Sequence, residues 1–257
     1  MKFSCCTTID NYDLVAANGY DRIILPAMGL LAMDAQAFAA TQRKLKAGPL
    51  ECVALNSFCT PQLVFCGHNY DEQTVADYIR PLAARASELG IRQMGVGAPQ
   101  SRNIPPEFPK QTALAQFGRT LSIICDACRP YGIDILLEAI CGQECNFITT
   151  TAEACEIIEM LQISNLKLVY DIYHAFMMNE DDQPLRRAMK YVQLVHIAQE
   201  INGQRHYLRA ENLEEYQVFT RALLEEGYDG EVSVEAFIDN MEVHLASTLA
   251  IMRSLLL

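Results

Sequence analysis

The chain has 257 residues, of which 51% are hydrophobic and 20% charged, and its formal net charge is −12. This length is close to the ~250 residues typical of a closed eight-stranded α/β barrel, and the apolar content is enough to bury a sheet beneath helices. The strong negative charge repels phosphodiester backbones and anionic membrane surfaces, which argues against nucleic acid and membranes as partners.

Two further features bear on the compartment. No apolar run reaches the ~20 residues needed to cross a bilayer, and residues 1–8 lack the basic and apolar regions that a secretory signal combines. We therefore expect a cytoplasmic protein. Its ten cysteines lie mostly inside apolar runs, which is typical of reduced, buried thiols. Cys125 and Cys128 form a Cys-x-x-Cys pair, but the surrounding pattern is helical and no second pair is present, which favours helix packing over a zinc site.

Apolar, β-branched runs bounded by turn residues alternate along the chain with stretches whose apolar residues recur every three or four positions. This alternation predicts parallel βαβ units. We expect eight strands, at residues 3–6, 22–25, 52–56, 93–97, 134–139, 167–171, 193–198 and 231–236. Helices are expected between them, for example at 71–89 and 212–226, each followed by a glycine that suits a left-handed cap.

Eight such units close into a (β/α)8 TIM barrel, and we expect residues 1–257 to form one barrel domain. A doubly wound open sheet would give the same alternation. However, the first βα turn offers no glycine-rich phosphate fingerprint, and eight strands match closure with none left at an edge. The sequence therefore favours the closed barrel.

Titratable side chains stand at the carboxyl ends of four consecutive expected strands: Glu138, Asp171, His196 and Glu235. In a barrel these ends converge on one cavity, where reactive groups lie. Burying such groups is costly unless they are paired or bind a metal. Three carboxylates and one imidazole suit Mn, Co or Mg, and Zn also accepts this set. Each acid could instead cap a helix or pair with an arginine, but four successive occurrences favour one divalent metal ion.

The second half of the chain resembles the sugar phosphate isomerase/epimerase superfamily with its xylose isomerase-like TIM barrel, and most closely its ketose 3-epimerase and hydroxypyruvate isomerase-like branch. Four blocks carry the resemblance: LLEAICGQECN, LVYDIYHAFMMNED, VQLVHIAQE and EEGYDGEVSVEAF. The resemblance implies that the four residues above are the metal ligands. It also implies substrate-binding roles for Glu144, six residues after Glu138, and for His174, three after Asp171.

One position departs from the family pattern. Family members usually carry an arginine six residues after the strand-seven histidine, followed by a proline-glycine loop, whereas this chain has Asn202 and no such loop. Arg205 and His206 lie close by and are the expected substitutes for substrate binding. His68, in the loop after the third strand, is a further candidate to line the mouth. Arg102 could meet a substrate phosphate, although exposed basic residues are ordinary in loops.

The resemblance implies a metal-dependent isomerase or epimerase of a small keto sugar or sugar phosphate. The ion would bind the carbonyl and the neighbouring hydroxyl, so that a proton leaves the adjacent carbon and a cis-enediolate forms. Glu138 and Glu235, on strands five and eight, are the expected acid–base pair. The resemblance also implies a homo-dimer or homo-tetramer.

Two other functions stay open from the sequence, and the chain argues against a third. Lyase or dehydratase chemistry on an inosose-like or dehydroshikimate-like substrate begins with the same proton abstraction. An endonuclease on the same barrel would need more histidine ligands and a basic face, whereas the chain has five histidines and a net charge of −12. A non-catalytic sugar-binding barrel would keep the cleft without turnover, and the missing arginine and proline-glycine loop would fit this function.

Overall fold

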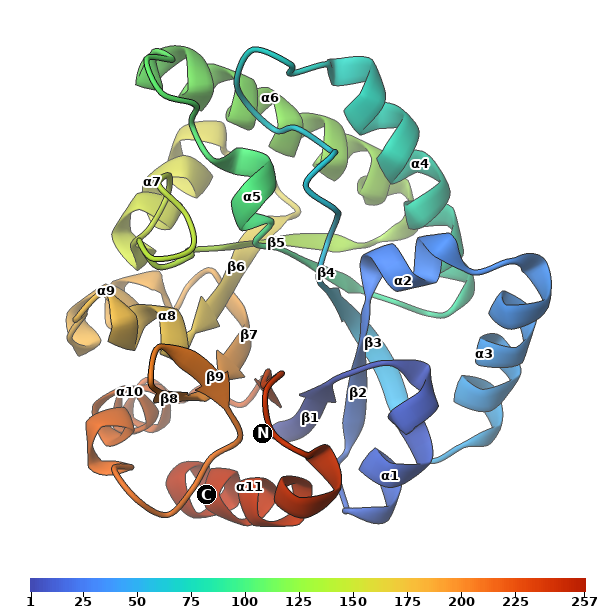
Figure 1. Cartoon of the computed structure of the whole chain (residues 1–257), viewed down its shortest axis with the longest axis vertical. Helices are drawn as coiled ribbons and strands as arrows, with labels where there is room; N and C mark the ends of the chain where they lie inside the picture. The colour runs from blue at the N-terminus through green and yellow to red at the C-terminus, as the bar shows by residue number, and fades with distance from the viewer.

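The computed structural model describes residues 1–257, and its centre is a closed barrel of eight parallel strands (Figure 1). The barrel strands are β1 (Lys2–Cys6), β2 (Arg22–Pro26), β3 (Glu51–Asn56), β4 (Gln93–Val96), β5 (Asp134–Glu138), β6 (Leu166–Asp171), β7 (Val192–Ile197) and β10 (Glu231–Val234). They follow one another around the barrel in chain order, and β10 closes it by pairing with β1. The predicted (β/α)8 TIM barrel is confirmed.

A ring of helices surrounds the barrel strands (Figure 1). The α-helices are α1 (Tyr12–Ala17), α2 (Ala27–Ala32), α3 (Ala35–Ala47), α4 (Glu72–Glu88), α5 (Pro99–Arg102), α6 (Lys110–Cys128), α7 (Thr151–Leu161), α8 (Ile172–Met177), α9 (Asp182–Ala188), α10 (Glu214–Glu225) and α11 (Met241–Leu256). Short 3₁₀ turns stand at Ile9–Asn11 and Arg129–Tyr131. None of the helices combines the length and the apolar character that crossing a membrane requires.

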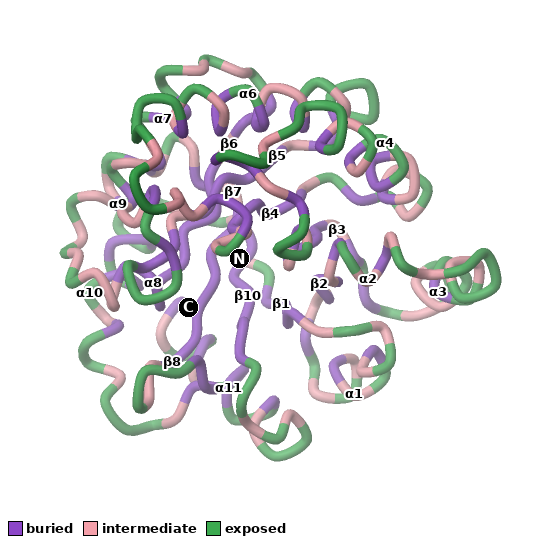
Figure 2. Tube along the Cα trace, turned by 45° about the horizontal axis from the view of Figure 1, so that its top comes forward, coloured by how far each residue is buried: buried purple, intermediate pink, exposed green.

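Most residues of the barrel strands are buried (Figure 2). Helices cover the outside of the sheet, and side chains fill the inside. A separate apolar cluster fills the interior and comprises Cys6, Ile24, Ala54, Leu136, Val169 and Leu194. Side chains alternate between the two faces of a strand, so the residues two positions after Leu136, Val169 and Leu194 also point inward. These residues are Glu138, Asp171 and His196, which therefore stand above an apolar floor.

The expected strands agree with the observed ones to within two residues at each end. The helix expected at 71–89 is α4, and the side chain of Asp71 caps its first turn. Gly90 and Gly227, which follow α4 and α10, have the positive φ angles expected of left-handed caps, +78° and +71°. Cys125 and Cys128 are buried in α6 and pack into the core, as the helical pattern predicts.

The sequence patterns do not predict one element of the fold. After β7 the chain forms an antiparallel hairpin of β8 (Gln199–Ile201) and β9 (Gln204–His206), separate from the barrel sheet. Its turn is Asn202 and Gly203, whose φ angles are +55° and +76°. Asn-Gly is the pair that such two-residue hairpin turns favour, because both positions need positive φ. This hairpin, and not a proline-glycine loop, follows the seventh barrel strand.

Candidate functional site

The carboxyl ends of four neighbouring barrel strands bring the predicted metal ligands together. Glu138 and Asp171 are the last residues of β5 and β6. His196 is the second-last residue of β7, and Glu235 follows β10 directly. All four are buried, and one donor atom from each lies within 4.8 Å of the others. Three carboxylates and one imidazole at this spacing fit a single divalent cation.

His196 lies between the two glutamates of the cluster. Its Nδ1 atom is 3.1 Å from Glu138 Oε1 and 3.3 Å from Glu235 Oε2. Asn56, the last residue of β3, donates from its Nδ2 to the other oxygen of Glu235, Oε1, at 2.7 Å. One oxygen of Glu235 thus faces the cluster, and the other is held by an amide outside it.

Arg205 of β9 reaches into the cluster. Its Nη1 donates to Glu235 Oε2 at 2.9 Å, and its Nη2 donates to Asp171 Oδ2 at 2.7 Å. The guanidinium also lies over the Tyr173 ring, 4.5 Å from the ring centroid. Asp171 Oδ1 accepts from the N–H of Tyr173 at 2.8 Å and caps α8. An isolated acid could cap a helix or pair with an arginine, and both contacts occur here. Asp171 makes both, Glu235 pairs with Arg205, and the two acids also belong to the four-residue cluster.

Burial and charge shift the pKa values of the carboxyl groups in opposite directions. Burial raises the pKa of Glu138 to about 7, although the His196 charge opposes this. Burial would also raise the pKa of Glu235, but the charges of His196 and Arg205 outweigh it and hold this pKa below its usual range. In Asp171, burial is outweighed first by the Arg205 charge, and the pKa is again lowered. One carboxyl group of the cluster therefore exchanges a proton near neutral pH, and two stay ionised.

Glu144 and His174 lie beside the cluster. Together with Cys141 they form a second group whose donor atoms lie within 4.8 Å of one another. His174 is buried in α8, and burial lowers its pKa to about 3, so its imidazole is neutral at physiological pH. Its Nδ1 accepts from the N–H of Cys141 at 3.2 Å. Glu144 is exposed in the loop after β5.

The remaining predicted residues make other contacts. His206 pairs through Nδ1 with Asp239 Oδ1 at 2.9 Å and not with the four-residue cluster. His68 is exposed and packs edge-on against Phe108, with ring centroids 4.9 Å apart. The prediction that Arg102 is an exposed loop residue is wrong. It is fully buried and donates to the backbone carbonyl of Glu138 at 2.8 Å, so it supports the end of β5 and does not face a substrate phosphate.

Comparison with known proteins identifies the family: residues 12–255 match the family described as xylose isomerase-like TIM barrel. The chain belongs to this family. The match confirms the predicted resemblance, and it extends over the first half of the chain, where no sequence motif carries it. In this barrel the four-residue cluster lies at the carboxyl ends of the strands, which is where TIM-barrel enzymes carry their active sites.

Curated relatives in the family agree with the predicted enzyme class. An inosose isomerase of Bacillus velezensis is 24% identical over 200 residues, which cover 72% of this chain and 67% of the relative. A ketose 3-epimerase of Arthrobacter globiformis is 28% identical over 144 residues, 55% of this chain and 48% of the relative. Among solved structures, D-psicose 3-epimerase from Clostridium cellulolyticum H10 matches with a TM-score of 0.81 at 15% identity. The match covers 100% of this chain and 99% of the epimerase chain.

In this xylose isomerase-like barrel, two side chains that the sequence analysis did not single out stand behind His196. The Cys6 Sγ atom, at the end of β1, lies 3.9 Å from His196 Nε2 and 3.2 Å from Ser233 Oγ. A partner at Nε2 orients the imidazole so that Nδ1 faces the carboxylates. No local signal separates Cys6 from the other buried cysteines, because only the closure of the barrel between β1 and β10 brings it to His196.

A cavity of about 370 Å³ opens beside the cluster, at the mouth of the xylose isomerase-like barrel. Its lining comes from the ends of β1, β2, β3 and β10, and includes Cys6, Asn56, Tyr207, Phe237 and Asp239. This volume is in the range of small-molecule pockets. Asn56 lines the cavity and also donates to Glu235, so the cavity borders directly on the cluster.

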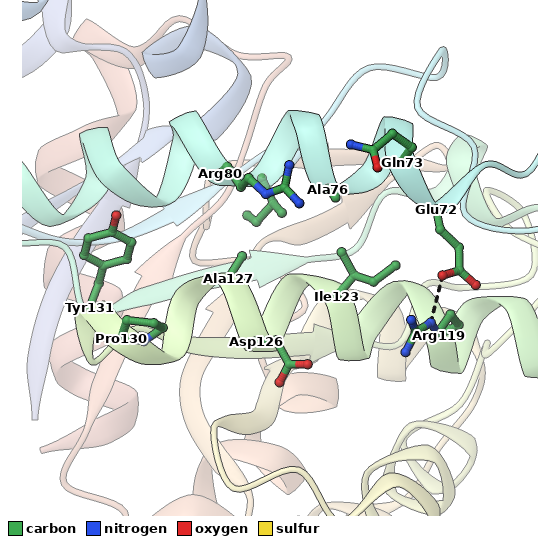
Figure 3. A pocket seen from close by; sticks show the side chains of 11 residues that line it. Glu72, Gln73, Ala76, Arg80, Arg119, Ile123, Asp126, Ala127, Pro130 and Tyr131 are labelled. Atoms are coloured by element: carbon green, nitrogen blue, oxygen red, sulfur yellow. Dashed lines mark hydrogen bonds and ion pairs between the residues drawn. The ribbon is translucent and has the colours of Figure 1, made fainter.

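A larger groove of about 540 Å³ lies on the outer surface between α4 and α6 (Figure 3). An ion pair between Glu72 Oε2 and Arg119 Nε, 2.9 Å apart, joins the two helices across it. None of its lining residues belongs to the barrel mouth or to the four-residue cluster. The groove is therefore separate from the candidate site.

Proposed function

We propose that this chain is a divalent-metal-dependent isomerase or epimerase that moves a proton on a small keto sugar or sugar phosphate. The observation that carries the proposal is the buried cluster of three carboxylates and one imidazole, in a family whose relatives include isomerases and epimerases. Its members, proposed as ligands of one ion, are Glu138, Asp171, His196 and Glu235. When bound there, a divalent ion would polarise a substrate carbonyl and make the adjacent C–H acidic.

Glu138 and Glu235 are suited to exchange protons with the two faces of the substrate carbon. They come from β5 and β10, the strands that flank β6 and β7 in the barrel. In the absence of metal, burial raises the pKa of Glu138 to about 7; a bound divalent ion would lower this pKa, so that Glu138 could accept a proton and return it. Glu235, whose pKa lies below its usual range, is ionised and can accept one. Delivery of a proton by the other glutamate to the opposite face of the same carbon gives epimerisation, and delivery of a proton to the adjacent carbon gives isomerisation.

We propose that Glu144, His174 and Arg205 bind substrate hydroxyls near the reacting carbon. His174 offers a neutral imidazole, and Glu144 offers a carboxylate at the exposed edge of the same group. His206 stays a predicted substrate contact, and its partner Asp239 lines the mouth cavity. His68, the homo-dimer or homo-tetramer and the cytoplasmic location also stay predictions.

Truncation of either substrate-binding side chain tests this assignment. We expect Glu144→Ala and His174→Ala each to lower kcat/KM by about 10- to 100-fold, the range lost with one or two hydrogen bonds to the substrate. The bound metal should remain at the wild-type level, because neither residue is assigned as a ligand. Steady-state kinetics and metal analysis on the same samples measure both. If both variants lost the metal, Glu144 and His174 would be ligands and not substrate contacts.

The proposed activity can be tested directly with the purified protein, loaded in turn with Mn²⁺, Co²⁺, Mg²⁺ and Zn²⁺. The panel of substrates is tagatose, psicose, fructose, hydroxypyruvate and an inosose, the last because one relative is named an inosose isomerase. We expect at least one of them to be interconverted with its isomer or epimer. A dehydrated product would point to the lyase alternative. Bound metal with every compound of the panel unchanged would support the non-catalytic sugar-binding barrel instead.

A further inference from the structure

We propose that the Arg205 guanidinium and the divalent cation are alternative partners of the same carboxylate oxygens, so that Arg205 competes with the metal and leaves the cluster when the metal binds. This inference rests on the metal site of the proposed function. It makes Arg205 the residue that sets the affinity of the site, in addition to its proposed contact with substrate.

The hydrogen bonds of Asp171 and Glu235 show which oxygens are shared. The outer oxygens are already held: Asp171 Oδ1 accepts from the N–H of Tyr173, and Glu235 Oε1 accepts from Asn56 Nδ2. The inner oxygens, Asp171 Oδ2 and Glu235 Oε2, both accept from Arg205. A cation that bridges these two carboxylates must therefore use the oxygens that Arg205 occupies.

Charge and burial make the two cations mutually exclusive. The Arg205 side chain is only 9% exposed, so little water screens its charge from the cluster. It is also the only lysine or arginine that forms ion pairs with the carboxylates of the cluster. A divalent ion bound to the same oxygens would lie at contact distance from the guanidinium, and two positive charges repel strongly at that distance in a buried site.

The contact with His174 makes the position of Arg205 in the cluster less favourable. A neutral imidazole has one nitrogen that accepts a hydrogen bond and one that donates. Here the Cys141 N–H points at Nδ1 at 3.2 Å, and Arg205 Nη2 lies 2.5 Å from Nε2. Both partners are donors, so His174 can satisfy only one of them. The position of Arg205 in the cluster is therefore favourable towards the carboxylates and unfavourable towards His174 or its backbone partner.

When Arg205 leaves the cluster, its position on the hairpin allows its side chain to turn towards the mouth of the barrel. Arg205 stands on β9, and the backbone of the hairpin is anchored by the Tyr216 hydroxyl, which accepts from the N–H of Glu200 at 2.7 Å. A rotation of the arginine side chain can thus move the guanidinium without moving the strand. Glu144 has a donor atom within 4.8 Å of His174, which Arg205 contacts through Nη2, so a further carboxylate lies beside the guanidinium. There the guanidinium would meet substrate at the open edge of the site.

Calorimetric titration with Mn²⁺ or Co²⁺, combined with thermal unfolding with and without the ion, tests the exchange. Arg205→Gln should bind the ion at least about 10-fold more tightly than the wild type, because two charge-assisted hydrogen bonds no longer compete. Its metal-free form should unfold at a lower temperature, since two buried carboxylates, Asp171 and Glu235, lose an ion-pair partner. Arg205→Lys, which keeps the charge but loses the fork, should bind with an affinity between the two and serves if Arg205→Gln does not fold.

Arg209→Gln is the matched control, because Arg209 lies four residues further on and pairs with Asp239, outside the cluster. Its metal affinity should equal that of the wild type. Metal affinity that is equal or weaker in Arg205→Gln than in the wild type, with the wild type binding the ion, would overturn the exchange and leave the proposed function standing. If neither the wild type nor any Arg205 variant bound an ion, the metal site itself would be wrong, and the exchange with it.

Discussion

Replacing Glu138 or Glu235 by glutamine is expected to lower turnover by at least about 100-fold, the lower end of what a positioned proton carrier contributes. Glutamine keeps the shape of the side chain and one oxygen for the ion, but its amide does not titrate near neutral pH and cannot act as a base or acid towards the substrate carbon. The two residues reach the site from β5 and β10, so each variant removes the carrier on one side. Turnover and metal content should be measured on the same preparation.

Glu231→Gln provides a matched control for both variants. Glu231 is also buried and begins β10, the strand that leads to Glu235, but it stands at the amino end of the barrel and pairs with Arg22 at 3.0 Å. Active sites of such barrels lie at the carboxyl ends of the strands, and residues at the amino ends contribute to stability. The control should therefore keep near-normal turnover and lose only stability. A glutamine variant of Glu138 or Glu235 with bound metal and normal turnover would rule that residue out as the proton carrier.

The second large effect concerns the metal itself. Purified protein, reconstituted with Mn²⁺, Co²⁺ or Zn²⁺, should hold about one ion per chain, and Asp171→Ala or His196→Ala should bring this close to zero. Each variant removes one of four donors from a site whose partners are fixed by strand ends, and metal affinity depends steeply on a complete ligand set. Elemental analysis after extensive dialysis measures the content.

Asp134→Ala is the control for the metal variants, since Asp134 begins β5, at the end of the barrel opposite to the cluster. This variant should bind the ion as the wild type does. About one ion per chain in Asp171→Ala and His196→Ala would contradict the assignment of the metal site. So would the absence of metal from the wild type after reconstitution with each ion.

The barrel and its four convergent residues could be predicted from the sequence because both depend on local pattern. Each strand is a short apolar run between turns, and Glu138, Asp171 and Glu235 interrupt or end such runs with a charge. Once eight strands alternate with helices, closure of the barrel brings their carboxyl ends together whatever the exact packing. The observed strand ends differ from the predicted ones by two residues at most. The direction in which each side chain points does not depend on where the strand is taken to end.

The position of Arg205 could not be predicted in the same way, although part of the signal was present. Asn202 and Gly203 form the dipeptide that most strongly favours a two-residue hairpin, and a hairpin turns the chain back on itself. This turn brings Arg205 opposite Glu200, from where its side chain reaches Asp171. Sequence spacing alone does not show which side of a hairpin faces the site, so Arg205 and His206 were equivalent candidates until the fold separated them.

Other parts of the site depend on contacts between distant strands. Cys6 meets His196, and Asn56 meets Glu235, across 190 and 179 residues of chain. Neither residue belongs to a motif, and each stands on a strand that carries no member of the four-residue cluster. Arg102 shows the opposite case. A basic residue in a loop is ordinarily exposed, but this one is buried and donates to the backbone carbonyls of Glu138 and Ile148. Such side-chain partners follow from tertiary packing and not from local pattern.

The most direct test of the account is the incorporation of solvent hydrogen into substrate. The central claim is that this site removes a proton from the carbon next to a carbonyl and returns one to the substrate. The metal-loaded wild type, incubated in deuterated water with each sugar of the panel, should place one deuterium at that carbon or at the adjacent one, as mass spectrometry and NMR detect. Interconversion of a sugar with no deuterium incorporated would contradict proton transfer through solvent-exchangeable carboxyl groups and, with it, the roles of Glu138 and Glu235.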